Sequence, residues 1–436
     1  MTNKESLNIA MFSNAYWPVV GGLERSVATF ADDLRELGHR VLIVTLAFPG
    51  AEESEETIFR LPAVKEIGGT QFSFKLPVPA GLKARLDRFA PDIVHSHHPF
   101  MVGDTALRVA RARGLPAVFT HHTMYERYTY LFSRESQALQ RIAMAIATEY
   151  ANLCDRVVAP TASIQRMIRQ RGVRVPIDVI PTGVDVEFSG SGDGAGFRRK
   201  HGIPPDAFVL GYLGRVVEAK NMEFLAQAVA RFLQESPDDV FLAVGDGESV
   251  TTVRRCLGEA GVADRLYLTG ALGGRAVADA YAAMDLFAFA SRTETQGIVL
   301  IESFCAGVPI VALDAPGARD IVQDGRNGVL LDDGASAERF AEELLRVRRD
   351  DALRGSMRRS ARERAREYDR RTCANQLEAV YRRLCDGRPR RRPDTGDPWP
   401  ALQERFATEW DLFREKIAVI TAAVRGEEEV PRLRSR

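Results

Sequence analysis

The chain has 436 residues, of which 45% are hydrophobic and 27% charged, a composition typical of a folded globular protein and not of a disordered or fibrous one. Lys plus Arg equals Asp plus Glu at 59 each, which excludes the broad basic field of nucleic-acid-binding proteins. The length exceeds one ordinary core and suits two domains of roughly 180 to 200 residues.

The five cysteines are scattered and lack Cys-x-x-Cys spacing, which favours reduced structural thiols over disulfides or a zinc site. No apolar run approaches the ~20 residues of a membrane span, and the polar N-terminus shows no signal peptide. We therefore expect a cytosolic, soluble protein with at most peripheral membrane contact. Residues 346–392 hold 17 Arg, no Lys and 7 acidic residues, which suits either a solvated helix face or contact with an anionic surface.

Strand and helix patterns alternate from the start of the chain. The run 8–12 predicts a buried strand, and 23–37 predicts a helix that ends at Gly38. Apolar, β-branched runs typical of parallel-sheet strands follow, with a helix between two of them. The strands are predicted at 40–45, 93–95, 117–120, 156–159 and 178–180, and the helix at 137–153.

The alternation restarts after the Gly-rich segment 189–196, which we interpret as a flexible break within an inter-domain linker at 188–205. Strands then follow at 208–213, 240–244, 265–268, 286–288 and 309–311. The sequence therefore predicts two α/β domains, residues 1–187 and 206–370, each with a mainly parallel sheet.

Residues 386–436 are predicted to form a linker, including 387–393, and an amphipathic helix at 401–424. Five apolar residues share one stripe of this helix: Phe406, Trp410, Phe413, Ile417 and Ile420. The stripe either docks onto the body of the protein or contacts a partner or a membrane.

Two places in the sequence suit an anionic ligand. Gly21 and Gly22 precede a helix, where backbone amides approach an anion at the positive N-terminus, although any tight turn can use two glycines. The pattern Gly-x-Gly-x-x-Gly is absent, which counts against a dinucleotide-dependent dehydrogenase. In the second domain Arg215 and Lys220 follow a strand and Gly214. Two cations there suit a departing diphosphate, and the alternative is two ordinary surface cations.

Two carboxylates stand in a largely apolar part of the second domain. Glu294 lies in a loop after a predicted strand, and Glu302 interrupts the apolar helix that follows. Both could accept hydrogen bonds from sugar hydroxyls; a cap residue and an exposed helix acid are the alternative. Backbone amides at the helix start are free to hold anionic or hydroxyl oxygens, near Gln296, Gly297 and Ile298.

Five of the seven histidines follow two predicted strands of the first domain: His95, His97, His98, His121 and His122. Imidazole is a common metal ligand. Adjacent histidines at strand ends are nevertheless expected to diverge, and no Asp-x-Asp follows a strand. We therefore predict no metal site, with at least one histidine lining a cleft and the others structural.

Together these motifs resemble the retaining glycosyltransferases with the GT-B architecture, the "glycosyl transferases group 1" type, over about residues 7–385. The strongest element is Glu294, seven residues, Glu302 and then Ala-Gly-Val-Pro. The supporting elements are Pro91-Asp-Ile-Val-His95, Ile180-Pro-Thr-Gly-Val-Asp185, Gly214-Arg215 with Lys220, and Gly245-Asp-Gly247. The resemblance implies two Rossmann-like domains facing a deep cleft, and a helix at 371–385 that returns to the first domain.

The resemblance also implies roles for single residues. Arg215 and Lys220 would bind the donor diphosphate, Glu302 would hydrogen-bond the ribose, and Glu294 would hold hydroxyls of the donor sugar. His122 matches the active-site histidine that contacts the transferring sugar. The implied donor-binding positions are Gly21, Gly22, Gly214, Arg215, Lys220, Gly245, Glu294, Gln296, Gly297, Ile298 and Glu302, and the implied catalytic residues are His122, Glu294, Arg215 and Lys220. No metal or other cofactor is expected.

Three segments are similar to the branch that contains diacylglycerol glucosyltransferases: Thr293-Glu-Thr-Gln-Gly297, His95-Ser-His-His-Pro-Phe-Met-Val-Gly103 and His122-Thr-Met-Tyr-Glu-Arg-Tyr128. The similarity implies UDP-glucose as donor and a membrane lipid as acceptor, with peripheral docking for which Arg108, Arg111 and Arg113 offer cations. A mannosyl- or glucosyltransferase acting on a soluble or polyprenyl-linked saccharide is the alternative. A catalytically silent nucleotide-sugar-binding scaffold is the alternative from another class.

Overall fold

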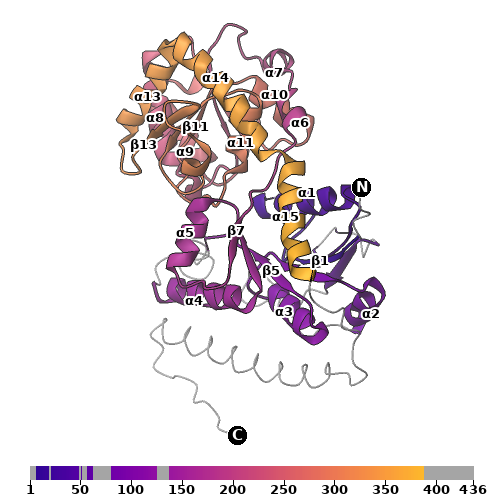
Figure 1. The fold of residues 1–436 in the computed structure, drawn as a ribbon. Coiled ribbons are helices and arrows are strands. Elements are labelled where there is room, and N and C mark those ends of the chain that lie inside the picture. The colour runs from indigo at the N-terminus through magenta and orange to yellow at the C-terminus, as the bar shows by residue number, and fades with distance from the viewer. Residues whose placement is uncertain are drawn as a thin grey trace. The chain divides into compact units, whose positions relative to one another are not determined.

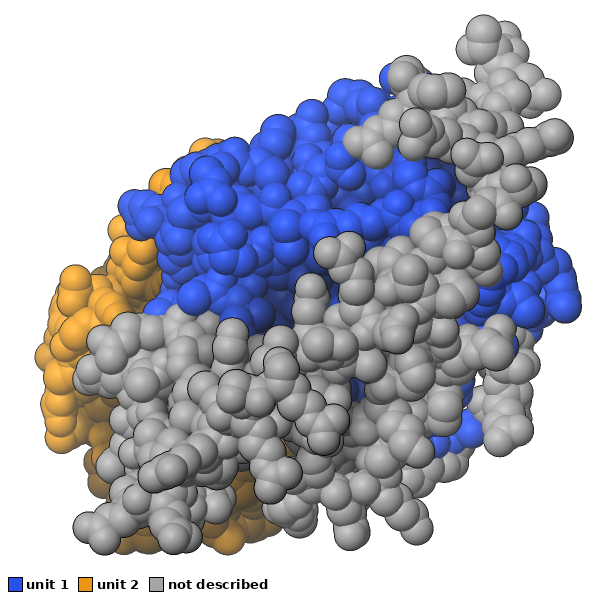
Figure 2. All heavy atoms as spheres, turned by 90° about the horizontal axis from the view of Figure 1, so that it is seen from below, with its two compact units in different colours: residues 1–158, 168–178, 378–436 blue, residues 159–167, 179–377 orange. Residues whose placement is uncertain are grey.

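The computed structural model describes residues 6–18, 21–48, 51, 56–61, 80–124 and 137–386. The chain divides into two compact units, shown as ribbons in Figure 1 and as coloured atoms in Figure 2. Unit 1 comprises residues 1–158, 168–178 and 378–436, and unit 2 comprises residues 159–167 and 179–377.

Unit 1 is built on a seven-stranded sheet with the strand order β3-β2-β1-β4-β5-β6-β7. The strands are β1 (Asn8–Phe12), β2 (Arg40–Leu46), β3 (Ile58–Leu61), β4 (Ile93–Ser96), β5 (Ala117–Thr120), β6 (Arg156–Ala159) and β7 (Ile177–Val179). All residues of β4 and β5 are buried, as expected where helices cover both faces of a parallel sheet. The strand order reverses between β1 and β4, and open α/β sheets bind ligands at such a switch point.

Helices of unit 1 pack on this sheet (Figure 1): α1 (Gly22–Glu36), α2 (Ala80–Phe89), α3 (Val102–Arg113), α4 (Gln137–Leu153) and the last part of α15 (Arg370–Cys385). The helix α5 (Ala162–Gln170) belongs to unit 2 up to Met167 and to unit 1 from Ile168. The helix α1 forms because its apolar residues recur at helical spacing and bury Val27, Phe30 and Leu34. It ends before Gly38, whose φ of +90° favours glycine.

Unit 2 repeats the plan with a six-stranded parallel sheet in the order β10-β9-β8-β11-β12-β13. Its strands are β8 (Val209–Leu213), β9 (Val240–Val244), β10 (Leu266–Leu268), β11 (Leu286–Phe289), β12 (Ile310–Leu313) and β13 (Gly328–Leu331). Here the order reverses between β8 and β11, which places a second switch point at the carboxyl ends of these strands. The predicted α/β class with two Rossmann-like units is confirmed.

The helices of unit 2 alternate with its strands: α6 (Val186–Gly190), α7 (Gly194–His201), α8 (Met222–Glu235), α9 (Val250–Glu259), α10 (Arg275–Ala282), α11 (Ile298–Cys305), α12 (Ala318–Ile321), α13 (Ala337–Arg349) and α14 (Asp351–Ala365). Short 3₁₀ helices lie at Glu218–Lys220, Ala263–Arg265 and Arg366–Tyr368. Fully buried aromatic rings on both faces of the sheet form the core, among them Phe232, Phe241, Phe287 and Phe304.

The Gly-rich segment 189–196 is not the flexible linker that its composition indicates. It holds the end of α6 and the start of α7, and the long segment of unit 2 already begins at Val179. Asp193 caps α7 by accepting a hydrogen bond from a first-turn N–H. A Cβ atom on Gly192 would overlap the carbonyl of Ala278 in α10, so glycine here permits close packing of backbones.

The helix predicted at 371–385 corresponds to α15, and from Glu378 onward its residues belong to unit 1. The predicted segments 387–393 and 401–424 lie outside the described residues. Among the helices that the structure describes, none combines the length and apolarity that a bilayer crossing requires.

The arginine-rich stretch is largely ion-paired where the structure describes it. The arginines that pair with an acid are Arg346, Arg348, Arg349, Arg354, Arg358, Arg364, Arg370, Arg382 and Arg383. Arg348, for example, donates two hydrogen bonds to Asp239, whose side chain is 2% exposed. This pairing favours a structural role for these arginines over an open basic surface.

Candidate functional site

The loops that follow β8 and β11 meet at the switch point of unit 2. Because β8 and β11 pair in parallel, their carboxyl ends share one edge of the sheet. Lys220 ends the 3₁₀ helix after β8, and Glu294 lies in the loop after β11. The ammonium group of Lys220 forms an ion pair with Glu294, and the two side chains are only 17% and 15% exposed. Two residues predicted from separate motifs are thus in direct contact.

The surroundings of Glu294 keep it ionised. Burial alone would raise the pKa of this carboxyl group, but attraction to Lys220 and hydrogen bonds from Lys220 and Ser291 outweigh burial and lower the pKa below its ordinary value. The charge of Arg215 acts in the same direction, so this guanidinium also lies within electrostatic reach of Glu294. The site therefore holds one carboxylate that is paired with Lys220 and is also stabilised by the charge of Arg215.

Arg215 is exposed, and a buried side chain of β8 holds its backbone in place. The hydroxyl group of the buried Tyr212 in β8 donates a hydrogen bond to the carbonyl of Arg215 at 2.8 Å. Gly214 and Gly245 have φ values of +150° and +138°, and a Cβ atom on Gly245 would overlap the carbonyl oxygen of Gly214. These two glycines allow the loops after β8 and β9 to pack against each other. Their predicted contact with the donor stays a separate prediction.

Glu302 is buried within α11, with only 2% of its surface exposed. The hydroxyl group of Tyr281 in α10 donates a hydrogen bond to its Oε2 atom at 3.1 Å. The acid that interrupts the apolar pattern of this helix is therefore held by a polar partner inside the unit and is not a solvated helix acid.

Gln296 does not offer its side chain to a ligand. Its amide group is 4% exposed and pairs with the backbone of Thr182, accepting from the N–H at 2.8 Å and donating to the carbonyl at 2.7 Å. The hydroxyl group of Thr161 donates to the carbonyl of Thr295 in the same loop. Of Gln296, only the backbone N–H therefore remains a predicted contact to the donor. The next residue, Gly297, is the N-cap of α11 and has a φ of +78°.

In unit 1 the loops after β1 and β4 meet in the same way. The N–H of Asn14 donates to His98 Nδ1 at 3.1 Å, and the N–H of Val102 donates to Asn14 Oδ1 at 3.1 Å. Gly21 is extended, Gly22 is the first residue of α1, and a Cβ atom on Gly21 would overlap the carboxylate of Glu24 in the first helical turn.

The adjacent residues His97 and His98 diverge as expected, toward His122 and Asn14 respectively, whereas the non-adjacent His95, His97 and His122 converge. His97 Nδ1 lies 2.9 Å from His122 Nε2, and the rings of His95 and His97 are 4.2 Å apart. The reason is the two-residue period of an extended chain, which turns these two side chains to one side, toward the residues that follow β5. Among the described residues, no three His, Cys, Asp or Glu side chains form a group suited to a metal ion.

All five clustered histidines are neutral at physiological pH, because burial disfavours their charged forms. Burial lowers the pKa of His95 and of His121 to about 3 and that of His98 to about 4. Burial and neighbouring imidazoles hold the pKa values of His97 and His122 well below the ordinary value. These rings can donate or accept hydrogen bonds, but they do not carry charge.

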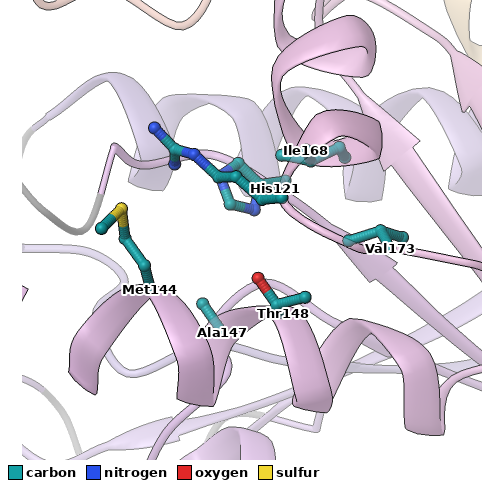
Figure 3. A pocket seen from close by; sticks show the side chains of 7 residues that line it. His121, Met144, Ala147, Thr148, Ile168 and Val173 are labelled. Atoms are coloured by element: carbon teal, nitrogen blue, oxygen red, sulfur yellow. The ribbon is translucent and has the colours of Figure 1, made fainter. Parts of the chain in front are cut away.

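A small pocket lies beneath His121 and not at His122 (Figure 3). It is lined by His121, Met144, Ala147, Thr148, Ile168, Arg171 and Val173 and has room for about one water molecule. Figure 3 shows the ring of His121 facing Thr148 of α4. The pocket contains none of the predicted donor-binding residues, so it is part of the packing of α4 and α5.

Comparison with known proteins identifies the family of the chain. Residues 20–188 match the family described as Glycosyltransferase Family 4, and residues 195–367 match the family described as Glycosyl transferases group 1. A GDP-mannose-dependent alpha-mannosyltransferase from Mycolicibacterium smegmatis is 30% identical over 334 residues, covering 75% of this chain and 84% of the relative. The chain belongs to the group 1 glycosyltransferases.

Other similar proteins extend over nearly the whole chain. An alpha-monoglucosyldiacylglycerol synthase from Acholeplasma laidlawii is 26% identical over 394 residues, covering 87% of this chain and 98% of the relative. The structure of Anabaena HepE in complex with UDP and glucose is similar with a TM-score of 0.69 and 23% identity, covering 86% of this chain and 99% of that chain. The enzyme is a hexosyltransferase with the GT-B fold.

Several residues that shape the candidate site were not predicted from the sequence. They are Tyr212, Tyr281, Thr161 and Thr182, which position the loops, and Tyr381, which hydrogen-bonds His95 at 2.5 Å. Buried tyrosines usually place the hydroxyl group on a polar partner, so a tyrosine inside an apolar strand such as β8 is the signal that could have identified Tyr212.

Proposed function

We propose that this enzyme transfers glucose from UDP-glucose, with retention of configuration, to a hydroxyl group of a membrane lipid such as diacylglycerol. Two alpha-monoglucosyldiacylglycerol synthases, from Acholeplasma laidlawii and Streptococcus pneumoniae, are each 26% identical to the chain and support the lipid acceptor. The UDP and glucose bound by the similar Anabaena protein support the donor. The enzyme would act at the cytoplasmic face of the membrane as a peripheral protein.

The observation that carries the proposal is the ion pair of Lys220 with Glu294. Both groups are mostly buried, and each satisfies the other's charge. A sugar diphosphate brings anionic oxygens for Lys220 and Arg215 and hydroxyl groups for Glu294, so it can replace the ion pair with interactions of both kinds. A cation beside the leaving phosphate stabilises the charge that develops there in the transition state.

In the proposed reaction the bond between C1 of glucose and the oxygen of the β-phosphate breaks, and an oxocarbenium-like centre forms. The acceptor oxygen bonds to C1 on the same face and loses its proton to the leaving phosphate oxygen. Lys220 and Arg215 hold that phosphate, and the amides from Gln296 to Ile298 and the carboxylate of Glu294 orient the sugar. The resemblance assigns the ribose to Glu302, which would have to exchange its hydrogen bond from Tyr281 for one from the ligand. His122 contacts the transferring sugar. Positioning and electrostatic stabilisation supply most of the catalysis.

A mannosyl donor is the second candidate, because the relative with 30% identity is a GDP-mannose-dependent enzyme. Its acceptor would then be a soluble or polyprenyl-linked saccharide. A silent binding protein is less well supported, because Arg215, Lys220, Glu294 and Glu302 are all present and Lys220 contacts Glu294 directly.

Thermal unfolding in the presence of UDP-glucose, GDP-mannose and ADP-glucose tests the donor, because a ligand that binds only the folded state raises Tm. We expect the largest increase with UDP-glucose. UDP release is then followed with diacylglycerol in vesicles and with a soluble saccharide as acceptors. Release with diacylglycerol alone supports the proposal, and a response to GDP-mannose with saccharide acceptors overturns it.

Membrane contact is tested separately by co-sedimentation with vesicles that contain or lack anionic lipid. Of the cations predicted for docking, Arg113 is paired with Asp87, and Arg111 is exposed. We therefore expect weak electrostatic attraction and binding that depends only modestly on anionic lipid. Absence of binding to both vesicle types would count against a membrane lipid as acceptor.

A further inference from the structure

His97 lies behind His122 and shares a hydrogen bond with it. His97 Nδ1 is 2.9 Å from His122 Nε2, and the two rings are stacked with centroids 5.1 Å apart and an angle of 26° between their planes. His97 is completely buried, whereas His122 is partly exposed. No substrate can therefore touch His97 in this conformation, and any effect of its side chain on the reaction must pass through His122.

The position of His97 is fixed by its other neighbour. The ring of His95 lies 4.2 Å from that of His97, and both nitrogens of His95 have partners: Tyr381 at 2.5 Å and Thr120 at 2.7 Å. Because His95 is locked at both nitrogens, it forms a rigid surface against which His97 packs. His97 in turn holds the inner edge of His122.

Burial also limits where the protons reside. Both rings are neutral, so each carries one N–H, and only one ring can donate in the bond between them. If His122 donates, the proton of His97 is on Nε2, a buried nitrogen that has no hydrogen-bond partner among the described residues. A buried donor without an acceptor is unfavourable and rare in proteins. The favoured arrangement has His97 Nδ1–H donating to His122 Nε2, which leaves the proton of His122 on Nδ1.

We propose that His97 is a positioning residue for glycosyl transfer, which fixes the ring orientation and the tautomer of His122 through their hydrogen bond. The inference rests on the proposed function, in which His122 contacts the transferring sugar. With its Nε2 occupied by His97, His122 presents Nδ1–H as a donor to a sugar oxygen. A neutral N–H donor that points in a fixed direction suits a sugar oxygen. If the ring of His122 rotated freely, this N–H would point at the sugar only part of the time.

Two substitutions separate hydrogen bonding from packing. His97→Leu keeps most of the apolar volume and removes the donor, and we expect kcat to fall about 10- to 100-fold with little change in KM for the donor. His97→Asn places an amide near the position of Nδ1, and we expect it to recover much of the lost kcat. His39→Leu is the control in the same unit, because His39 is also buried and its Nδ1 accepts a hydrogen bond from a backbone N–H. It should lower Tm and leave kcat unchanged.

A double variant distinguishes failure of this inference from failure of the proposed function. If His122→Ala retains full turnover, the proposed role of His122 is wrong. If His122→Ala is impaired, the inference predicts that adding His97→Leu reduces kcat no further, because His97 acts only through His122. Independent losses that multiply in the double variant, or full activity of His97→Leu, would overturn the positioning role.

Nitrogen-15 NMR of the imidazoles gives a second measurement that needs no variant to fold. The inference predicts that His122 is protonated on Nδ1 in the native enzyme and that His97 is protonated on Nδ1 as well. Protonation of His122 on Nε2 would contradict it.

Discussion

Lys220→Ala separates the chemistry of the site from its stability. The substitution removes a cation that is 17% exposed and leaves Glu294, which is 15% exposed, without its ion-pair partner. Breaking a fully buried pair costs about 3–5 kcal/mol, and because some water and Arg215 still screen this carboxylate, we expect a loss of about 2 kcal/mol in the free energy of unfolding. The loss of one electrostatic contact to the leaving phosphate should lower kcat about 100- to 1000-fold.

The stability loss should depend on pH in a defined direction. In the native enzyme the pKa of Glu294 is lowered, so its ionisation stabilises the fold above its unfolded pKa of about 4.3, and this contribution disappears as the pH falls through the folded pKa. Without Lys220, burial is no longer outweighed and the pKa rises. The difference in Tm between the native enzyme and Lys220→Ala should therefore be largest near neutral pH and should shrink toward about pH 4.

The assay is UDP release at saturating donor, together with Tm for each protein. Arg198→Ala is the matched control, because the ion pair of Arg198 with Asp285 has similar exposure, 16% and 23%. Asp285 precedes the amino end of β11, whereas Glu294 follows its carboxyl end, so the control pair lies away from the candidate site. The control should lose stability and keep its kcat. Equal turnover of folded Lys220→Ala and the native enzyme would remove Lys220 from the mechanism.

Two further substitutions test the loops around this site. Tyr212→Phe removes the hydroxyl group that donates to the carbonyl of Arg215. We expect KM for the donor to rise several-fold and the free energy of unfolding to fall by about 1 kcal/mol. An unchanged KM would show that the Arg215 loop does not need this hydrogen bond. Gln296→Leu leaves the buried N–H and carbonyl of Thr182 unpaired, and denaturant unfolding should show a loss of about 2–4 kcal/mol; a loss below 1 kcal/mol would contradict the buried pairing.

The sequence predicted most of the fold because long periodic segments carry a strong signal. The helix α4 and the strand β1 have the predicted bounds, and the two-domain α/β plan is correct. The strands β3 and β13 were not predicted. The Gly-rich segment 189–196 was misinterpreted, since composition does not distinguish flexibility from close packing against another helix.

The site was predictable where motifs follow neighbouring strands. Lys220 and Glu294 are 74 residues apart, yet their residue types and positions after strands predicted a diphosphate contact for one and a sugar contact for the other. The partner of Gln296 was not predictable, because Thr182 lies 114 residues away in a loop whose position depends on tertiary packing. The expectation that adjacent histidines diverge holds for His97 and His98, and the two-residue period of an extended chain explains why His95 and His97 converge.

Calorimetric titration of UDP is the most direct test of the claim that the cations after β8 hold the donor diphosphate. The native enzyme should bind UDP, and the folded double variant Arg215→Ala with Lys220→Ala should bind it at least tenfold more weakly, with the difference reduced at high salt. Equal affinity of the two proteins for UDP would contradict the account.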